Sequence, residues 1–123
     1  MNQGAKFIEF KGKPIYYVDY SNIKTSEEFL AIIKSTNAFR EKLKRDGKKD
    51  LLMLVNISES FVYGDVLTEI KKAATLTREL IAKEAIVGIT GSKKILLKIL
   101  QSLTKIDYKI FDTEEEAKEW LVS

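Results

Sequence analysis

The segment from Glu84 to Leu103 constrains the fold more than any other part of the sequence. It begins with a short apolar run, residues 85–89, of the length expected for a strand buried on both faces. Thr90, Gly91 and Ser92 follow as a tight turn that can supply a helix N-cap. Apolar side chains then recur at the spacing of one helix face, at Leu96, Ile99, Leu100 and Leu103. Strand, glycine turn and helix form half of a βαβ unit, so the sequence predicts an α/β protein with parallel strands.

The rest of the chain extends this alternation of strands and helices. Two β-prone runs, residues 7–10 and 14–20, flank a glycine and predict a hairpin. Capping boxes at Thr25 and Thr113 predict helices over roughly 25–45 and from 113 onward. Further elements are expected as strands at 51–55 and 108–111 and as a helix starting at Asp65 and reaching Leu80 or Ile81. The expected order is ββαβαβαβα, which is one α/β domain over residues 1–123, with a mixed sheet of about five strands and about four helices.

Length and composition favour a single cytoplasmic domain. A chain of 123 residues with 45% hydrophobic and 32% charged residues can bury one core. The chain has no apolar run of membrane-spanning length and its start lacks the apolar region of a secretory signal. It has no cysteine, so nothing indicates an oxidising compartment.

The absence of two residue types limits the chemistry open to this chain. Without His and Cys, catalytic triads, cysteine nucleophiles and the usual structural zinc sites are excluded. Acid–base catalysis would fall to Asp, Glu, Lys or Tyr, and no motif positions such groups together. We therefore expect no enzymatic activity, no cofactor and no metal. The net charge of +3 does not require nucleic acid as a partner, and the lysine-rich clusters are better interpreted as solvated helix faces.

Four stretches in a fixed order resemble the SpoIIAA-like family of the STAS superfamily, the fold of anti-sigma factor antagonists. They are residues 17–21, 51–56, 85–94 and 111–121, within a similarity that runs from about Ile15 to the C-terminus. The resemblance implies a small α/β domain with no known enzymatic activity. It also implies relatives that act as phosphorylation-controlled protein-binding switches.

The resemblance directs attention to the segment from Asn56 to Asp65. In classical STAS antagonists a serine at the start of the helix after the third strand accepts phosphate from a partner kinase. The candidates here are Ser58 and Ser60, but neither stands in the Asp-Ser-Ser-Gly setting of that family. Hydroxyls that bond the local backbone are therefore the favoured interpretation, with phosphoacceptors as the alternative.

Two further sites follow from the residues themselves. Phe61 and Tyr63 lie in an otherwise polar loop, where they would either bury under the next helix or serve as aromatic anchors for a partner. The turn at residues 90–92 precedes a helix N-terminus, which can bind an anion. Its glycine spacing does not match a P-loop, so a structural turn is favoured over an anion site.

The expected function is that of a cytoplasmic, non-enzymatic STAS-like domain that binds an unidentified protein. The expected contact residues are Asn56, Phe61, Tyr63 and Asp65. The alternative is a small-ligand or lipid carrier of CRAL-TRIO-like character, since that related fold carries lipids. This alternative requires an internal pocket. The sequence does not separate a monomer from a homodimer.

Overall fold

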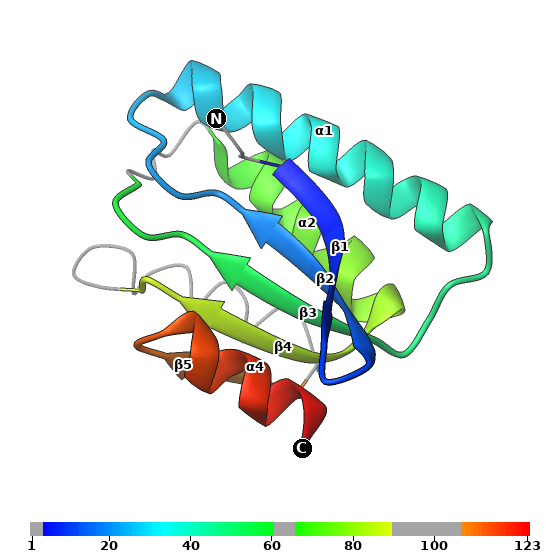
Figure 1. Cartoon of the computed structure of the whole chain (residues 1–123). Coiled ribbons are helices and arrows are strands. Elements are labelled where there is room, and N and C mark those ends of the chain that lie inside the picture. The colour runs from blue at the N-terminus through cyan, green and yellow to red at the C-terminus, as the bar shows by residue number, and fades with distance from the viewer. Residues whose placement is uncertain (1–3, 61–65, 90–106) are drawn as a thin grey trace.

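A five-stranded sheet crosses the middle of the molecule (Figure 1). The computed structural model describes residues 4–60, 66–89 and 107–123. The strands follow one another in the sheet in chain order, and β1 is antiparallel to β2 whereas the other neighbours are parallel. Their bounds are β1 (Gly4–Phe10), β2 (Lys13–Asp19), β3 (Leu51–Asn56), β4 (Ile81–Val87) and β5 (Asp107–Phe111).

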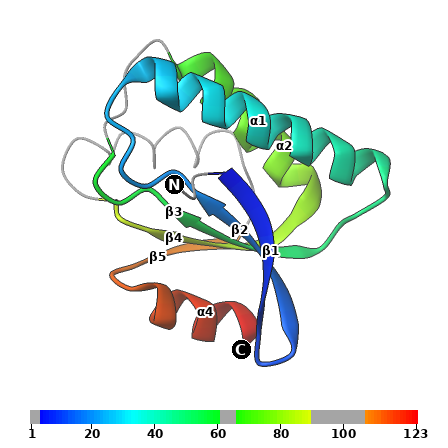
Figure 2. The ribbon, with the colours of Figure 1, turned by 45° about the horizontal axis from the view of Figure 1, so that its top comes forward.

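Helices cover both faces of this sheet. They are α1 (Ser26–Arg45), α2 (Leu67–Leu80) and α4 (Glu114–Val122). Figure 2 shows α1 and α2 together on one face and α4 on the other. The prediction of a mixed α/β sheet with an N-terminal hairpin is confirmed. The helix expected after residue 92 lies outside the described residues.

The strand β4 differs from its predicted position. The apolar run predicted a strand over residues 85–89, but β4 begins at Ile81, immediately after α2, and ends at Val87. The pattern missed Lys83 and Glu84 because charged residues interrupt it, although Glu84 is buried. The strand stops where Gly88 takes a φ of 95°, a conformation that does not continue a sheet.

The N-cap signals predicted at Thr25 and Thr113 are confirmed, whereas α2 begins at Leu67 with Val66 as its N-cap and not at the predicted Asp65. The hydroxyl of Thr25 accepts a hydrogen bond from the Glu28 N–H at 3.1 Å and donates to the Glu28 carboxylate at 2.9 Å. The same pair of bonds joins Thr113 and Glu116 at 3.2 and 3.0 Å. At the end of α1, Gly47 has a φ of 77° and the helix closes with Schellman-type bonds. Each of these caps fixes the end of a helix next to a neighbouring strand.

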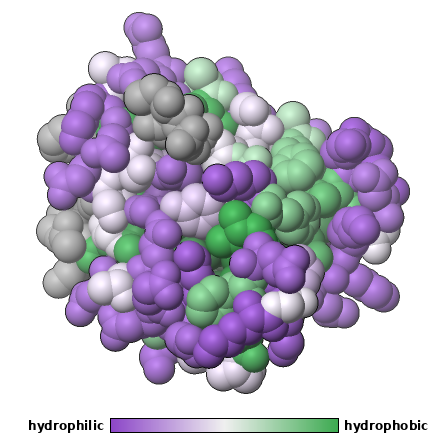
Figure 3. All heavy atoms as spheres, viewed as in Figure 1, coloured by the Kyte–Doolittle hydropathy of each residue, from purple (hydrophilic) through white to green (hydrophobic). Residues whose placement is uncertain are grey.

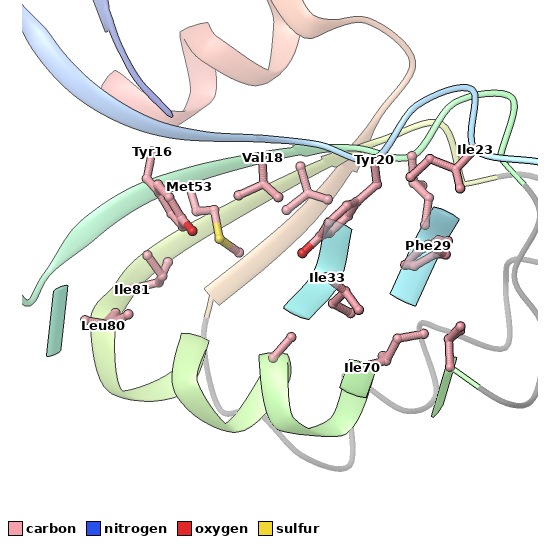
Figure 4. Packing of buried hydrophobic residues seen from close by; sticks show 14 of the residues in the cluster. Tyr16, Val18, Tyr20, Ile23, Phe29, Ile33, Met53, Ile70, Leu80 and Ile81 are labelled. Atoms are coloured by element: carbon pink, nitrogen blue, oxygen red, sulfur yellow. The ribbon is translucent and has the colours of Figure 1, made fainter. Parts of the chain in front are cut away.

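The core consists of two apolar layers, one on each side of the sheet. Figure 4 shows side chains such as Tyr16, Val18 and Met53 pointing from the sheet towards α1 and α2. Alternate residues, among them Ile15 and Leu54, point the other way and pack under α4. Because both faces are covered, β3 can be apolar at every position except its last, which explains its unbroken apolar sequence.

A small aromatic cluster reaches the surface beside β1. Phe7 is 42% exposed and its ring contacts Tyr16 and Phe39, with ring centroids 5.6 and 6.3 Å apart. Figure 3 shows a hydrophobic patch next to β1, below the second half of α1, surrounded by hydrophilic side chains. β1 is the edge strand on this side of the sheet.

Candidate functional site

The carboxyl ends of β2, β3 and β4 meet at one edge of the sheet, which we call the loop edge (residues 19–24, 56–60 and 87–89). Sites in open α/β sheets form at this edge. Backbone bonds continue across it beyond the strands: the Tyr20 N–H donates to the Asn56 carbonyl at 2.8 Å, and the Ile57 N–H donates to the Val87 carbonyl at 2.9 Å. The three loops are therefore held as one surface.

Ser60 links the loop after β3 to the loop after β2 by hydrogen bonds. Its hydroxyl donates to the Tyr20 carbonyl and accepts a hydrogen bond from the Ile23 N–H at 2.8 Å. The residue is 5% exposed. Both hydrogen-bonding roles of the hydroxyl are thus occupied by backbone groups, and a phosphate on Ser60 would require the two loops to separate.

Ser58 lies in a different environment, half-buried over the end of β4. Its N–H donates to the Asn56 side-chain oxygen at 2.9 Å, and its carbonyl accepts from the Asn22 N–H at 2.9 Å. A Cβ atom on Gly88 would stand only 2.5 Å from the Ser58 backbone nitrogen. The close approach of these two loops therefore depends on a glycine at position 88. Of the two candidate phosphoacceptors, Ser58 is the less deeply buried.

Asn56 also connects the loop edge to α4. Its side-chain amide donates to the Glu114 carboxylate at 2.7 Å, and the Tyr17 hydroxyl donates to the same oxygen at 2.6 Å. Burial and the hydrogen bond to Glu114 raise the pKa of Tyr17 above its usual value. Asn56 is thus engaged within the domain on both sides, through Ser58 and through Glu114.

Two residues of the loop edge adopt a left-handed backbone conformation. Asn22 and Glu59 each have a φ of 60°, which is ordinary for Asn but costly for Glu. Lys24 donates to the Glu59 carbonyl, so the exposed ends of the two loops are also joined. Asn22, Lys24 and Glu59 are the exposed side chains that this edge presents among the described residues.

The remaining predicted site residues cannot be placed on this surface. Phe61, Tyr63 and Asp65, together with Thr90, Gly91 and Ser92, lie outside the described residues. Their roles as partner contacts and as an anion-binding turn stay predictions.

Sequence reasoning missed a polar cluster inside the core. The Arg40 guanidinium, 2% exposed, donates to the hydroxyls of Thr36 and Tyr20 at 3.2 and 3.3 Å and to the Asn37 side-chain oxygen at 2.9 Å. All three acceptors are neutral, and Arg40 Nε has no hydrogen-bond partner in the part of the chain that the structure describes. The only signal was positional, since Arg40 lies one turn after Thr36 and three residues before Leu43, on the predicted apolar face of α1.

Glu84 is the second buried charged residue of the core, at 4% exposure. Burial raises the pKa of its carboxyl to about 7, against the opposing influence of Arg40. Burial acts to lower the pKa of Arg40, but Tyr20, Tyr16 and Glu84 together hold it above its usual value. Arg40 and Glu84 both line a cavity of about 80 Å³ between the sheet and helices α1 and α2.

The described part of the chain offers neither a metal site nor a membrane-spanning helix. It contains no group of three or more Asp and Glu side chains that could hold a metal ion. None of its helices combines the length and apolar character needed to span a lipid bilayer.

Comparisons with known proteins agree with this architecture. No curated protein matches the sequence. A crystal structure of an uncharacterised protein with a SpoIIAA-like fold from Shewanella loihica PV-4 is similar at a TM-score of 0.67 and 12% identity, over 96% of this chain and 92% of that one. The family model named SpoIIAA-like matches residues 15–122. The match covers all the elements described above except β1 and the first two residues of β2, and it establishes that this chain belongs to the SpoIIAA-like family.

Proposed function

We propose that this protein is a non-enzymatic cytoplasmic regulatory domain that binds another protein through its loop edge. Membership of a family with a STAS-like fold supports a regulatory domain at a coarse level. The observation that carries the more specific proposal is the cross-connection of the loops, in which Ser60 and the Lys24–Glu59 bond hold exposed side chains in fixed positions.

Fixed loops favour association because less conformational entropy is lost when a partner binds. The loops that carry Asn22, Lys24 and Glu59 are joined to each other by hydrogen bonds and to β4 through the Ile57–Val87 bond. Phe61 and Tyr63 follow directly in sequence, and we propose that they add apolar contact to this surface. Ser58 is the hydroxyl that we propose as the phosphoacceptor, since Ser60 has both of its hydrogen-bonding roles filled.

A photocrosslinking experiment tests the placement. A photoreactive amino acid replaces Glu59 on the loop edge, where the backbone carbonyl that accepts from Lys24 is kept, and, as the matched control, Ser35 on the exposed side of α1. We expect one protein from the host to be crosslinked at position 59 and not at position 35. We also expect the Phe61→Ala, Tyr63→Ala double variant to weaken its capture. Equal capture at the two positions would contradict the proposed surface.

A second role, the binding of a small molecule, is favoured by the cavity beside Arg40 and Glu84. Its lining is mostly apolar, and its volume of about 80 Å³ corresponds to roughly two or three water molecules at liquid density. We propose that it holds a ligand of a few non-hydrogen atoms. Native mass spectrometry of protein purified gently from its host tests this role, because a retained small molecule adds a discrete mass that disappears on denaturation.

A further inference from the structure

The cavity between the sheet and helices α1 and α2 has an apolar body and a charged end. Its apolar walls come from all the elements around it, and include Phe29, Ile33, Val55, Ile70, Ala74 and Ile86. The charged end is formed by Arg40 from α1 and Glu84 from β4. Both residues are at least nine-tenths buried, so their charges are not screened by solvent.

The charges at this end are unbalanced. Among the described residues, the guanidinium of Arg40 donates only to neutral oxygens, and its Nε–H has no acceptor. The Glu84 carboxyl takes part in no hydrogen bond within the described part of the chain, and its raised pKa leaves it partly protonated near neutral pH. A buried cation is therefore left without a full counter-charge, and a buried donor on the guanidinium is left without an acceptor.

We propose that the cavity binds a short-chain monocarboxylate, whose carboxylate pairs with the Arg40 guanidinium and accepts a hydrogen bond from the protonated Glu84 carboxyl. This inference rests on the small-molecule role proposed above and adds its chemical class. A carboxylate supplies the missing negative charge and the missing acceptor together. The alkyl chain then lies against the apolar walls. The volume of about 80 Å³ limits that chain to a few carbons, since roughly 150 Å³ accommodates benzene.

Binding of this kind takes up a proton above neutral pH. Two negative charges beside one guanidinium would leave a net buried charge, so the ligand binds the form in which Glu84 is protonated. Below pH 7 Glu84 is already protonated and the affinity is level, whereas above pH 7 each bound ligand requires one proton. With a pKa of about 7, the affinity is expected to fall about tenfold between pH 6 and pH 8.

The other groups that face Glu84 from neighbouring elements are one guanidinium and several phenols. Arg40 faces it from α1, and Tyr16 and Tyr20 lie on the same side of the sheet in β2. In β5 its register partner is Tyr108, and the residues of α2 that line the cavity are uncharged. A phenol ordinarily ionises about pH 10 and a guanidinium above pH 12, so a change between pH 6 and pH 8 is assigned to Glu84.

Calorimetric titration of the whole chain with butyrate tests the proposal, with 1-butanol as the uncharged probe of similar size. Wild-type protein is expected to bind butyrate saturably at pH 6 and about tenfold more weakly at pH 8, and to bind 1-butanol more weakly at pH 6.

Glu84→Gln keeps a hydrogen-bond donor at the same place, so its affinity for butyrate is expected to be the same at both pH values. The control Glu9→Gln, on the exposed side of β1, is expected to keep the wild-type pH dependence. Ala74→Val fills part of the cavity and is expected to abolish binding while leaving the fold intact.

The outcomes distinguish binding of a carboxylate from binding of small molecules in general. Butanol binding as tightly as butyrate, or a pH dependence that persists in Glu84→Gln, would overturn the carboxylate inference and leave small-molecule binding standing. Binding of neither probe by folded wild-type protein at pH 6 would overturn both.

Discussion

The buried carboxyl of Glu84 makes the stability of this protein depend on pH in a defined direction. The pKa of Glu84 is about 7 in the folded chain, against 4.5 as its ordinary value. The folded state therefore holds this proton more tightly than the unfolded state. The stability contribution of protonated Glu84 is fully present below about pH 4.5 and is lost as the pH rises to 7. At about 1.4 kcal/mol for each pH unit, the loss amounts to roughly 3 kcal/mol.

The substitution Glu84→Gln removes this titration and keeps the size of the side chain. We expect the free energy of unfolding of the variant, relative to wild type, to rise by about 3 kcal/mol between pH 4.5 and pH 8. Urea denaturation at half-unit pH intervals measures this difference directly. Nearly all of the change is expected below pH 7, with a plateau above it. Glu9→Gln, the same substitution at an exposed position of β1, serves as the control.

One result would refute the reasoning. If the stability difference between wild type and Glu84→Gln is the same at pH 4.5 and pH 8, Glu84 titrates alike in the folded and unfolded states. The carboxyl would then be hydrated or paired in solution, and the account of an unbalanced charge beside Arg40 would fail.

Three further substitutions, two of them with a matched control substitution, test the loop edge and a helix end, each measured by urea denaturation. Gly88→Ala is expected to cost about 2–3 kcal/mol because its Cβ would meet the Ser58 backbone, whereas Gly12→Ala, with open space around it, should cost only about 1 kcal/mol for its positive φ. Ser60→Ala is expected to cost about 1–3 kcal/mol by leaving buried backbone groups unpaired, and Ser58→Ala less than about 0.5 kcal/mol; equal losses would contradict the role given to Ser60. Thr113→Ala removes the N-cap of α4 and is expected to cost about 1 kcal/mol, so an unchanged midpoint would argue against the capping geometry.

The fold could be predicted from the sequence where one local pattern determines the structure. At Thr25 and Thr113 the threonine hydroxyl caps a backbone N–H of the helix and is itself bound by the glutamate three residues later, so four residues carry the whole signal. The apolar run of β3 is likewise a short local pattern, and it predicts a strand that is covered on both faces. The sequence pattern predicts the start of β4 at residue 85, whereas the strand begins at Ile81. The pattern misses this start because Glu84 is buried beside residues distant in sequence, and no local pattern encodes that pairing.

At the candidate site, too, local patterns could be predicted and contacts between distant residues could not. Asn56 and the two serines were found because they follow a strand, and strand ends gather at one edge of a parallel sheet. The hydrogen bonds by which Ser60 links two loops could not be predicted, since its partners Tyr20 and Ile23 lie about 40 residues earlier. Arg40 was overlooked because arginine on an apolar helix face is ordinarily a solvated end of a long side chain. The cavity that it lines exists only when α1, α2 and β4 are assembled.

The position of α4 on its own side of the sheet has a consequence for synthesis of the chain on the ribosome. The side chains of Ile15 and Leu54 are made well before the residues that cover them, Ala117 and Leu121. One apolar face of the sheet therefore stays uncovered until α4 has left the ribosome, and until then it is open to chaperones and to aggregation. The bond between Lys11 and Glu119 at 2.8 Å then joins the first hairpin to α4. Shielding of this face accordingly depends on the arrival of a nine-residue helix.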